Sequence, residues 1–284
     1  MSQGLHASQA SRASQSATND KMRIIDSHCH VYPQAIAAKA VKGVSDFYDG
    51  VGDSCDGLAP TVREQWKKKG VDHAIIFSVA TKRPQVESIN NFIAKAVSES
   101  DGFFTGLGAM HQDYPDMGEA VDTMISLGLK GVKMHLEMQE CALDDSRLLP
   151  LYEACADRIV VYLHTGDKRY DYSNPDRLMR VLKMFPHTTF VGAHFGGWSI
   201  WDEATRLLHG FDNLYVDSSS TFHWVEHIKV KDYIRAYGSE RVMFGSDFPM
   251  WDVEHEIRYM LELKLTDEEY ENVFHRTAER VFDI

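Results

Sequence analysis

The stretch Ile24-Ile25-Asp26-Ser27-His28-Cys29-His30 decides how the rest of the chain is interpreted. Two apolar residues lead into an Asp-x-His-x-His pattern. Side chains alternate between the two faces of a β-strand, so His28 and His30 are expected to point the same way. Neutral imidazole nitrogens suit Zn, Mn, Fe or Ni better than Ca or Mg. Two polar residues can also simply end a buried strand, so the metal interpretation depends on the segments that follow.

Composition and charge exclude several classes of protein. The chain has 284 residues, of which 44% are hydrophobic and 25% charged, the usual range for a soluble globular protein. A net charge of -12 argues against nucleic acid or an anionic membrane as partner, since both need clustered Lys and Arg. We find no apolar run long enough to cross a bilayer. A small-molecule substrate is compatible with this charge, and the composition leaves open whether the chain forms a homo-oligomer.

The cysteines indicate a reducing compartment. The four cysteines contain no CxxC pair, which favours reduced thiols in a cytoplasmic protein over a disulfide framework. The start of the chain differs in composition from the remainder. Residues 1–21 are rich in Ser, Ala and Gln and are predicted to be a disordered polar tail, whereas residues 22–284 are predicted to form a single barrel domain. The tail lacks the apolar segment of a secretory signal.

Eight apolar, β-branched segments recur along the chain, with helical patterns between most of them. They are Arg23–Ser27, Asp72–Val79, Phe103–Ala109, Leu129–Met134, Ile159–Leu163, Thr189–Ala193, Asn213–Val216 and Arg241–Phe244. Eight β-then-α units in one domain predict an α/β fold of the (β/α)8 TIM-barrel type. The alternative is a doubly wound open sheet, but the G-x-G-x-x-G fingerprint after the first strand is absent.

A long insertion separates the first strand from the next helix. It runs over residues 32–60 and contains four glycines. A structureless loop of this length is unusual in a compact domain, so part of it, Gln34–Val41, is predicted to be helical. The insertion is expected to form a lid over the carboxyl ends of the strands.

Chemically useful side chains stand at the carboxyl ends of several predicted strands, which converge on one face of a barrel. The segments concerned are Asp26-Ser-His28-Cys-His30, Gly131-Val-Lys133-Met-His135, His164-Thr-Gly166, Ala193-His194-Phe-Gly-Gly197 and Gly245-Ser-Asp247-Phe-Pro249. Each motif is weak by itself. Their repeated position after an apolar run predicts one shared site.

Together, these motifs resemble the metal-dependent amidohydrolase superfamily, and more closely its amidohydrolase-2 branch, which includes aminocarboxymuconate-semialdehyde decarboxylase and related aromatic-acid decarboxylases. They occur in family order and span nearly the whole chain from residue 22. The resemblance implies a barrel with His28, His30, His164 and Asp247 as metal ligands. It also implies that His194 either supports those ligands or acts in catalysis.

The chemistry of this ligand set supports the same assignment. Three imidazoles and one carboxylate suit one divalent transition metal, with Zn expected first and Mn, Fe or Ni as alternatives. Such an ion lowers the pKa of a bound water to about 7. Asp247 can then accept a proton, and His194 can polarise a carbonyl or stabilise an oxyanion. The competing interpretation of His194 is a hydrogen-bonded core histidine.

Lys133 has three interpretations. In binuclear members of the superfamily, a carbamylated lysine at the end of the fourth strand bridges two metals. In the mononuclear branch that this chain resembles most, Lys133 would be an ammonium donor to the substrate, and we favour that role. A lysine buried beside a cation has a lowered pKa, so a neutral amine is the third interpretation.

Several residues are predicted to contact the substrate. Arg169 can grip a carboxylate through bidentate hydrogen bonds, with Tyr170 beside it. His135 lies on the same strand face as Lys133. An apolar wall is predicted from the aromatic residues Trp198, Trp251, Tyr32 and Tyr48. For each of these aromatic residues the alternative is ordinary loop packing.

The predicted function is hydrolysis of a C–N or C–O bond in a small organic substrate by a metal-bound hydroxide. The alternative is non-oxidative decarboxylation of a small carboxylic acid, which uses the same ligands. A second alternative is a non-catalytic metal-binding barrel, which the filled catalytic positions disfavour. Fold analogy does not separate the first two reactions.

Overall fold

A computed structural model describes residues 22–52 and 54–284, so the predicted polar tail lies outside the described residues. The described chain contains nine strand segments, and every pair of neighbouring segments is parallel. The segments are β1 (Ile25–His30), β2 (His73–Phe77), β3 (Phe104–Gly106), β4 (Gly108–Ala109), β5 (Gly131–Met134), β6 (Val160–Leu163), β7 (Phe190–Gly192), β8 (Leu214–Asp217) and β9 (Val242–Met243). Each falls within or beside a predicted strand.

The strands close into an eight-stranded barrel. Each strand pairs with the next along the chain, and β3 and β4 are two parts of one barrel strand interrupted at Leu107, whose N–H still bonds to Ile76 on β2. The ring closes where Ser27 N–H donates to the Phe244 carbonyl and His30 N–H donates to the Phe248 carbonyl, at 2.9 and 2.7 Å. The predicted (β/α)8 TIM barrel is therefore confirmed.

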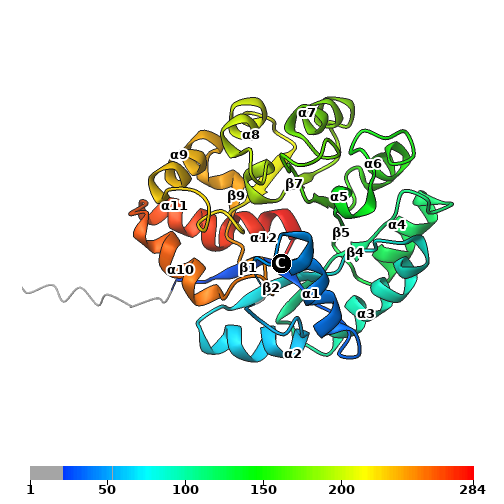
Figure 1. Cartoon of the computed structure of the whole chain (residues 1–284), viewed down its shortest axis with the longest axis horizontal. Coiled ribbons are helices and arrows are strands. Elements are labelled where there is room, and N and C mark those ends of the chain that lie inside the picture. Colours follow the sequence, from blue (N-terminus) through cyan, green and yellow to red (C-terminus); the bar gives the residue numbers. More distant parts are fainter. Residues whose placement is uncertain (1–21, 53) are drawn as a thin grey trace, which may run out of the picture.

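Helices form an outer layer around the strands (Figure 1). The α-helices are α1 (Ala37–Phe47), α2 (Ala59–Thr61), α3 (Val86–Ser98), α4 (Met117–Ser126), α5 (Leu136–Gln139), α6 (Leu149–Cys155), α7 (Pro175–Met184), α8 (Trp201–Leu208), α9 (His227–Tyr237), α10 (Val253–Glu262), α11 (Asp267–Glu271) and α12 (Thr277–Phe282). Short π or 3₁₀ turns span Val62–Trp66, Arg83–Gln85, His194–Gly196, Ser239–Arg241 and Asn272–Arg276. The insertion after β1 is helical as expected, but α1 begins and ends later than the predicted Gln34–Val41.

Two apolar clusters hold the barrel together. The larger lies between strands and surrounding helices, and the smaller fills the barrel interior with side chains such as Ile25, Ile75 and Val160. Ala278 and Phe282 of α12 belong to the interior cluster, so this last helix closes the barrel near the amino ends of the strands. The carboxyl ends are left to build a site, as is usual for this fold.

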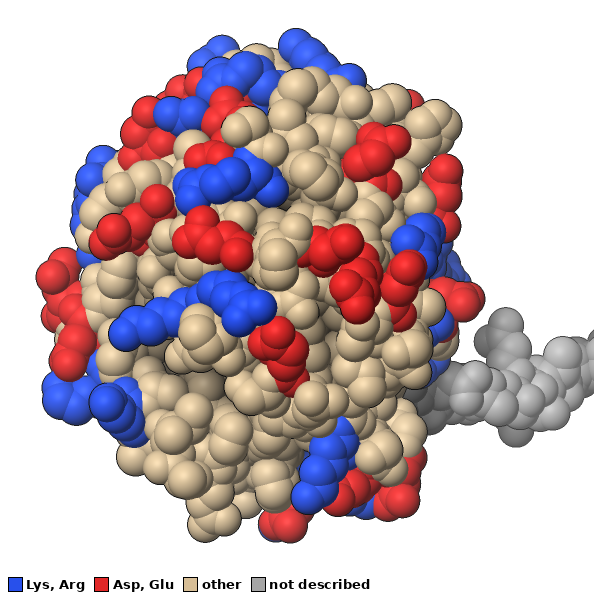
Figure 2. Space-filling view, turned by 90° about the vertical axis from the view of Figure 1, so that its right-hand side faces the viewer, with Lys and Arg blue, Asp and Glu red and all other residues tan. Residues whose placement is uncertain are grey.

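The surface carries both signs of charge. On the face in Figure 2, Lys and Arg side chains alternate with Asp and Glu, and no extended patch of one sign is present there. Within residues 22–52 and 54–284, every helix is too short or too polar to cross a membrane.

Candidate metal centre and active-site cavity

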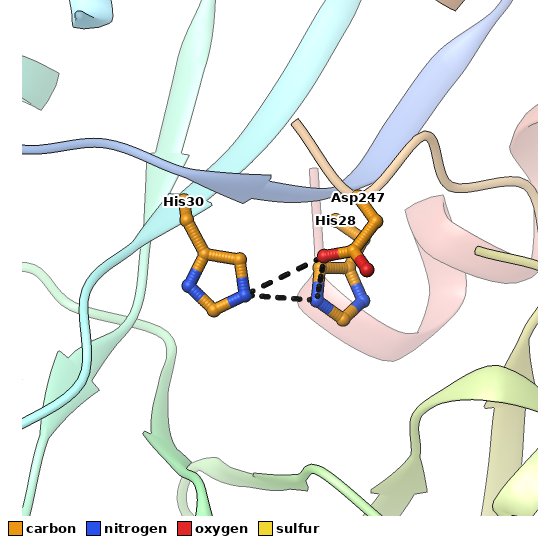
Figure 3. Close-up of side chains that lie close together, drawn as sticks. All are labelled: His28, His30 and Asp247. Carbon is orange, nitrogen blue, oxygen red and sulfur yellow. Dashed lines mark hydrogen bonds and ion pairs between the residues drawn. The ribbon is translucent and has the colours of Figure 1, made fainter. Parts of the chain in front are cut away.

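His28, His30 and Asp247 meet at the carboxyl end of the barrel (Figure 3). The two histidines come from β1, and Asp247 follows β9. The two Nε2 atoms lie 3.2 Å apart, and Asp247 Oδ1 lies 3.2 Å from His28 Nε2 and 3.6 Å from His30 Nε2. Ligand atoms around a tetrahedral ion with bonds of about 2.0–2.1 Å are separated by about 3.3 Å. These three side chains therefore fit a divalent transition metal in both chemistry and spacing.

Asp217 orients His28 from behind. Its Oδ2 lies 3.0 Å from His28 Nδ1 and also accepts a hydrogen bond from the Tyr162 hydroxyl. Burial opposes the charged form of Asp217, but His28, His194 and the Ser219 hydroxyl together outweigh burial and hold the pKa of this carboxyl well below its usual range. A carboxylate at Nδ1 places the proton on that nitrogen and leaves Nε2 as the ligand atom, the common arrangement around metal-binding histidines. Asp217 ends β8 on the same barrel face, a position that could have suggested this role from the sequence.

The structure places His164 in a second group, with His135 and Glu137. His194 Nδ1 lies 2.9 Å from the Ser219 carbonyl, so it donates there, and His194 Nε2 accepts from His164 Nδ1 at 3.1 Å. This chain of hydrogen bonds leaves His164 Nε2 without a proton, as a ligand atom requires. Burial lowers the pKa of His194 to about 4, which keeps this ring neutral.

Lys133 lies beneath the site and outside the cavity lining. Its Nζ is 3.4 Å from His28 Nε2 and rests 4.4 Å from the Tyr162 ring centre and 4.8 Å from that of Phe77. Burial lowers the pKa of the Lys133 ammonium to about 8. The structure thus brings Lys133 to His28 rather than into the cavity.

A cavity of about 740 Å³ opens above these residues. Most of the residues predicted from the sequence line it, namely His30, His164, His194, Asp247, His135, Tyr32, Tyr48, Trp198 and Trp251. Phe47 and Trp224 extend the aromatic wall. His28 is buried behind the lining, with its Nε2 directed at His30 and Asp247.

Arg169 and Tyr170 are outside the cavity lining. The Arg169 guanidinium forms a bidentate pair with the buried Asp167 and donates to the Phe47 carbonyl at 2.7 Å. It also stacks on Phe47, Tyr48, Tyr170 and Trp198, with ring centres 4.9–5.6 Å away. Arg169 therefore fastens the end of α1 over the cavity.

Sequence reasoning gave no role to two acidic residues that the structure brings to the site, Asp217 and Glu137. Glu137 lies on α5, one short turn beyond β5, and its side chain lines the cavity. Ser220, which donates to Asp247 Oδ2 and accepts from Trp251 Nε1, was also missed. A serine in a loop carries no sequence signal of this kind.

Comparisons with solved structures support the fold. The 5-carboxyvanillate decarboxylase LigW from Sphingomonas paucimobilis shares 17% identity and a TM-score of 0.69, covering 93% of this chain and 100% of that one. A 2,6-dihydroxybenzoate decarboxylase complexed with 2,6-dihydroxybenzoate shares 13% identity and a TM-score of 0.72, with 93% of this chain and 100% of that one covered. A dihydroxybenzoic acid decarboxylase from Polaromonas sp. JS666, with bound manganese and 2-nitroresorcinol, shares 14% identity and a TM-score of 0.69, with 93% and 97% covered.

No curated protein matches the chain significantly in sequence. At identities this low, the solved structures establish the barrel fold but not the reaction. The family model is more specific, because it matches residues 25–284 and is described as amidohydrolase. This chain therefore belongs to the amidohydrolase-2 family and is an enzyme of the hydrolase or decarboxylase type.

Proposed function

We propose that the protein is a metal-dependent decarboxylase that removes carbon dioxide from a small aromatic carboxylic acid without oxidation. The observation that carries this proposal is the aromatic-walled cavity directly above His30 and Asp247. The decarboxylases of similar fold, whose names specify aromatic acids, support the choice of reaction.

The cavity wall suits a flat ring. Tyr48 and Trp198 contact each other with ring centres 4.9 Å apart, and Trp224 continues the wall 6.2 Å from Trp198. Aromatic side chains hold a planar ligand by offset-stacked and edge-to-face contacts. An apolar site also favours decarboxylation, because a localised carboxylate charge gives way to a more dispersed charge as carbon dioxide forms.

The proposed metal ligands are His28, His30 and Asp247, with His164 as the fourth. When bound, the divalent ion acts as a Lewis acid that orients the substrate oxygens and disperses negative charge. The imidazole-rich ligand set favours Zn, whereas manganese is bound in the Polaromonas decarboxylase. Metal analysis of the purified protein is the measurement that decides between these ions.

The reaction requires a proton at the carbon that loses carbon dioxide. The C–C bond breaks, its electron pair stays on the ring carbon, and that carbon is protonated. Asp247 is proposed to hold this proton, since it lines the cavity and Ser220 fixes its Oδ2. His194 has both ring nitrogens occupied by Ser219 and His164, so it is proposed to position His164.

Carbon dioxide release from a panel of aromatic acids, compared with hydrolysis of amides, esters and lactones, tests the proposal. We expect release from at least one acid, and loss of activity in Asp247→Asn by about 100-fold or more. Asp232→Asn, which changes an exposed carboxylate on α9, is the matched control and should retain full activity. Hydrolysis without carbon dioxide release would contradict the proposal and favour the second candidate, C–N or C–O hydrolysis, which the description of the family model supports.

A further inference from the structure

One buried carboxylate oxygen in the cavity has no partner among the described residues. Glu137 Oε1 accepts a hydrogen bond from the Ser173 hydroxyl, but Oε2 is left without one. The side chain is 1% exposed and lines the cavity. An unsatisfied buried acceptor costs about 1–3 kcal/mol, and more when it is charged. Such an atom in an active-site cavity points to a ligand group that satisfies it.

The two nearest histidines do not meet this need. His135 Nδ1 lies 3.4 Å from Glu137 Oε2, but it accepts the Met138 N–H and so faces the carboxylate with a lone pair. His164 Nε2 is 3.9 Å from Oε2, beyond hydrogen-bonding distance. It also lacks a proton, because His164 Nδ1 donates to His194. Three acceptor atoms therefore converge at this end of the cavity.

The Tyr48 hydroxyl, from the residue that follows α1, lies beside these two histidines. It lies 2.9 Å from His135 Nε2 and 3.3 Å from His164 Nε2. The Tyr48 hydroxyl accepts from His135 Nε2–H, because His135 Nδ1 already accepts the Met138 N–H. Among the described residues, no hydrogen bond joins the Tyr48 hydroxyl to Glu137. We call Tyr48, His135 and Glu137 the acceptor end of the cavity.

The distribution of charge sets what can bind there. Among the described residues that line the cavity, Lys39 is the one Lys or Arg, and it is exposed on α1. A substrate carboxylate therefore has a favourable place beside the ion at His30 and Asp247 but not at Glu137, where two anions would share a buried space. A neutral or cationic O–H or N–H group has the opposite preference, because it supplies the missing donor.

We propose that Glu137 is a specificity-determining residue that selects aromatic monocarboxylic acids bearing an O–H or N–H donor and disfavours dicarboxylic acids. The inference rests on the proposed function, since it assumes that the substrate's carboxylate lies beside the ion at His30 and Asp247. Sites built to hydrogen-bond one group reject analogues that lack it, because their own buried group is then unpaired.

Binding of four probes to the metal-loaded full chain, measured by isothermal titration calorimetry, tests the inference without relying on turnover. The probes are benzoate, 3-hydroxybenzoate, 3-methoxybenzoate and isophthalate, repeated with the 4-substituted series to allow for ring position. In one of the two series, wild type should bind the hydroxy acid about 10- to 100-fold more tightly than the methoxy acid, the range expected for a hydrogen bond to a charged group. The dicarboxylate should bind most weakly.

Glu137→Gln should abolish this preference, since its amide presents a donor where the carboxylate presented an acceptor. Affinity for benzoate and the metal content should stay unchanged. Glu140→Gln is the matched control: Glu140 follows the same short helix and lines the same cavity, but it is exposed. This variant should keep the wild-type order of affinities.

Several results would overturn the inference. A preference that survives in Glu137→Gln would remove Glu137 from recognition. An equal loss of affinity for all four probes would assign it a purely structural role, and loss of a metal equivalent would make it a ligand. Tight benzoate binding without any preference in wild type would contradict this inference and leave the proposed function standing. Failure of every acid to bind would contradict both.

Discussion

The Nε2 atoms of His28 and His30 lie 3.2 Å apart on one side of β1. His28 Nε2 carries no proton when that ring is neutral, because Asp217 takes the His28 proton at Nδ1. Burial lowers the pKa of His30 well below its usual value, so a charged ring is disfavoured as well. When His30 also presents its Nε2 lone pair, the two nitrogens can bind one shared cation.

The first prediction concerns the metal. Purified protein should contain about one equivalent of a divalent transition metal, and His30→Ala should weaken binding by more than about 100-fold, since loss of even an outer partner costs about 10- to 100-fold. Inductively coupled plasma mass spectrometry measures the content. His187→Ala is the control, because that exposed ring contacts only Asp157 in the described structure. Unchanged metal content in His30→Ala would remove His30 from the ligand set.

His164→Ala tests the fourth ligand. We expect this variant to lose most of its metal, since an unprotonated Nε2 at the end of β6 is available to the ion. Chelation of the wild type should lower its stability by about 2.7 kcal/mol when the ion had been present at 100 times its Kd. Chelation should have little further effect on His164→Ala. Full metal retention by the variant would instead place His164 with Glu137 and His135, as a residue of the cavity wall.

Asp26 is expected to matter for stability. Its buried carboxylate accepts hydrogen bonds from Trp66 Nε1 at 2.7 Å and from the Ser246 N–H at 2.9 Å, and so joins β1 to the loop that carries Asp247. Asp26→Asn replaces one acceptor by a donor and should cost about 2–3 kcal/mol of unfolding free energy. Urea denaturation measures this loss. Asp46→Asn, which breaks an exposed ion pair with Lys42, should change stability by less than about 1 kcal/mol.

Arg169 is expected to affect substrate binding by holding the end of α1 over the cavity. Arg169→Lys removes the bidentate pair with Asp167 and the stacking on α1, neither of which an ammonium reproduces. We expect KM for the decarboxylation substrate to rise by about 10-fold, which corresponds to a loss of roughly 1.4 kcal/mol of substrate-binding free energy. The value of kcat should change less. Arg158→Lys, at an exposed pair with Asp122, is the control. A fall in kcat with KM unchanged would show that Arg169 contacts the reacting group instead.

Lys133 separates the one-metal and two-metal forms of the site. Its Nζ lies beside His28 Nε2, the proposed ligand atom, where an ammonium repels a dication, so Lys133→Met should keep or raise metal affinity while saturation still reaches one equivalent. Metal titration with mass spectrometry of the intact protein reads both quantities. A second equivalent in the wild type, lost in the variant together with the mass of a carbamate, would contradict this prediction. It would show that Lys133 bridges two ions.

The sequence by itself determined the barrel and placed most of the proposed metal ligands at one end of it. Strand alternation has a period of two residues, so His28 and His30 had to share a face of β1 in any fold that keeps the strand. The β/α alternation then brought His164, His194 and Asp247 to the carboxyl end, because parallel strands in a closed barrel all point one way. These inferences need only local periodicity and one topological rule.

The tertiary structure decided the roles of the remaining residues. Lys133 alternates with Met134 as expected, but only the closed barrel places its Nζ under His28, between the Tyr162 and Phe77 rings. Arg169 was predicted to bind a substrate carboxylate, but in the folded chain its guanidinium pairs with the Asp167 carboxylate. A short strand pattern in the sequence does not specify which distant side chain will pair with a given charged group in the folded chain.

The acceptor end of the cavity shows this most clearly. Tyr48 and His135 are 87 positions apart in the sequence, and their hydrogen bond exists because α1 folds back over the barrel. In the sequence, Glu137 is one acidic residue of a short helix. Only the folded chain shows that its Oε2 is buried without a hydrogen-bond partner among the described residues. Burial and long-range approach set the cost of leaving a polar atom unpaired, and both follow from packing of the whole chain rather than from any one segment.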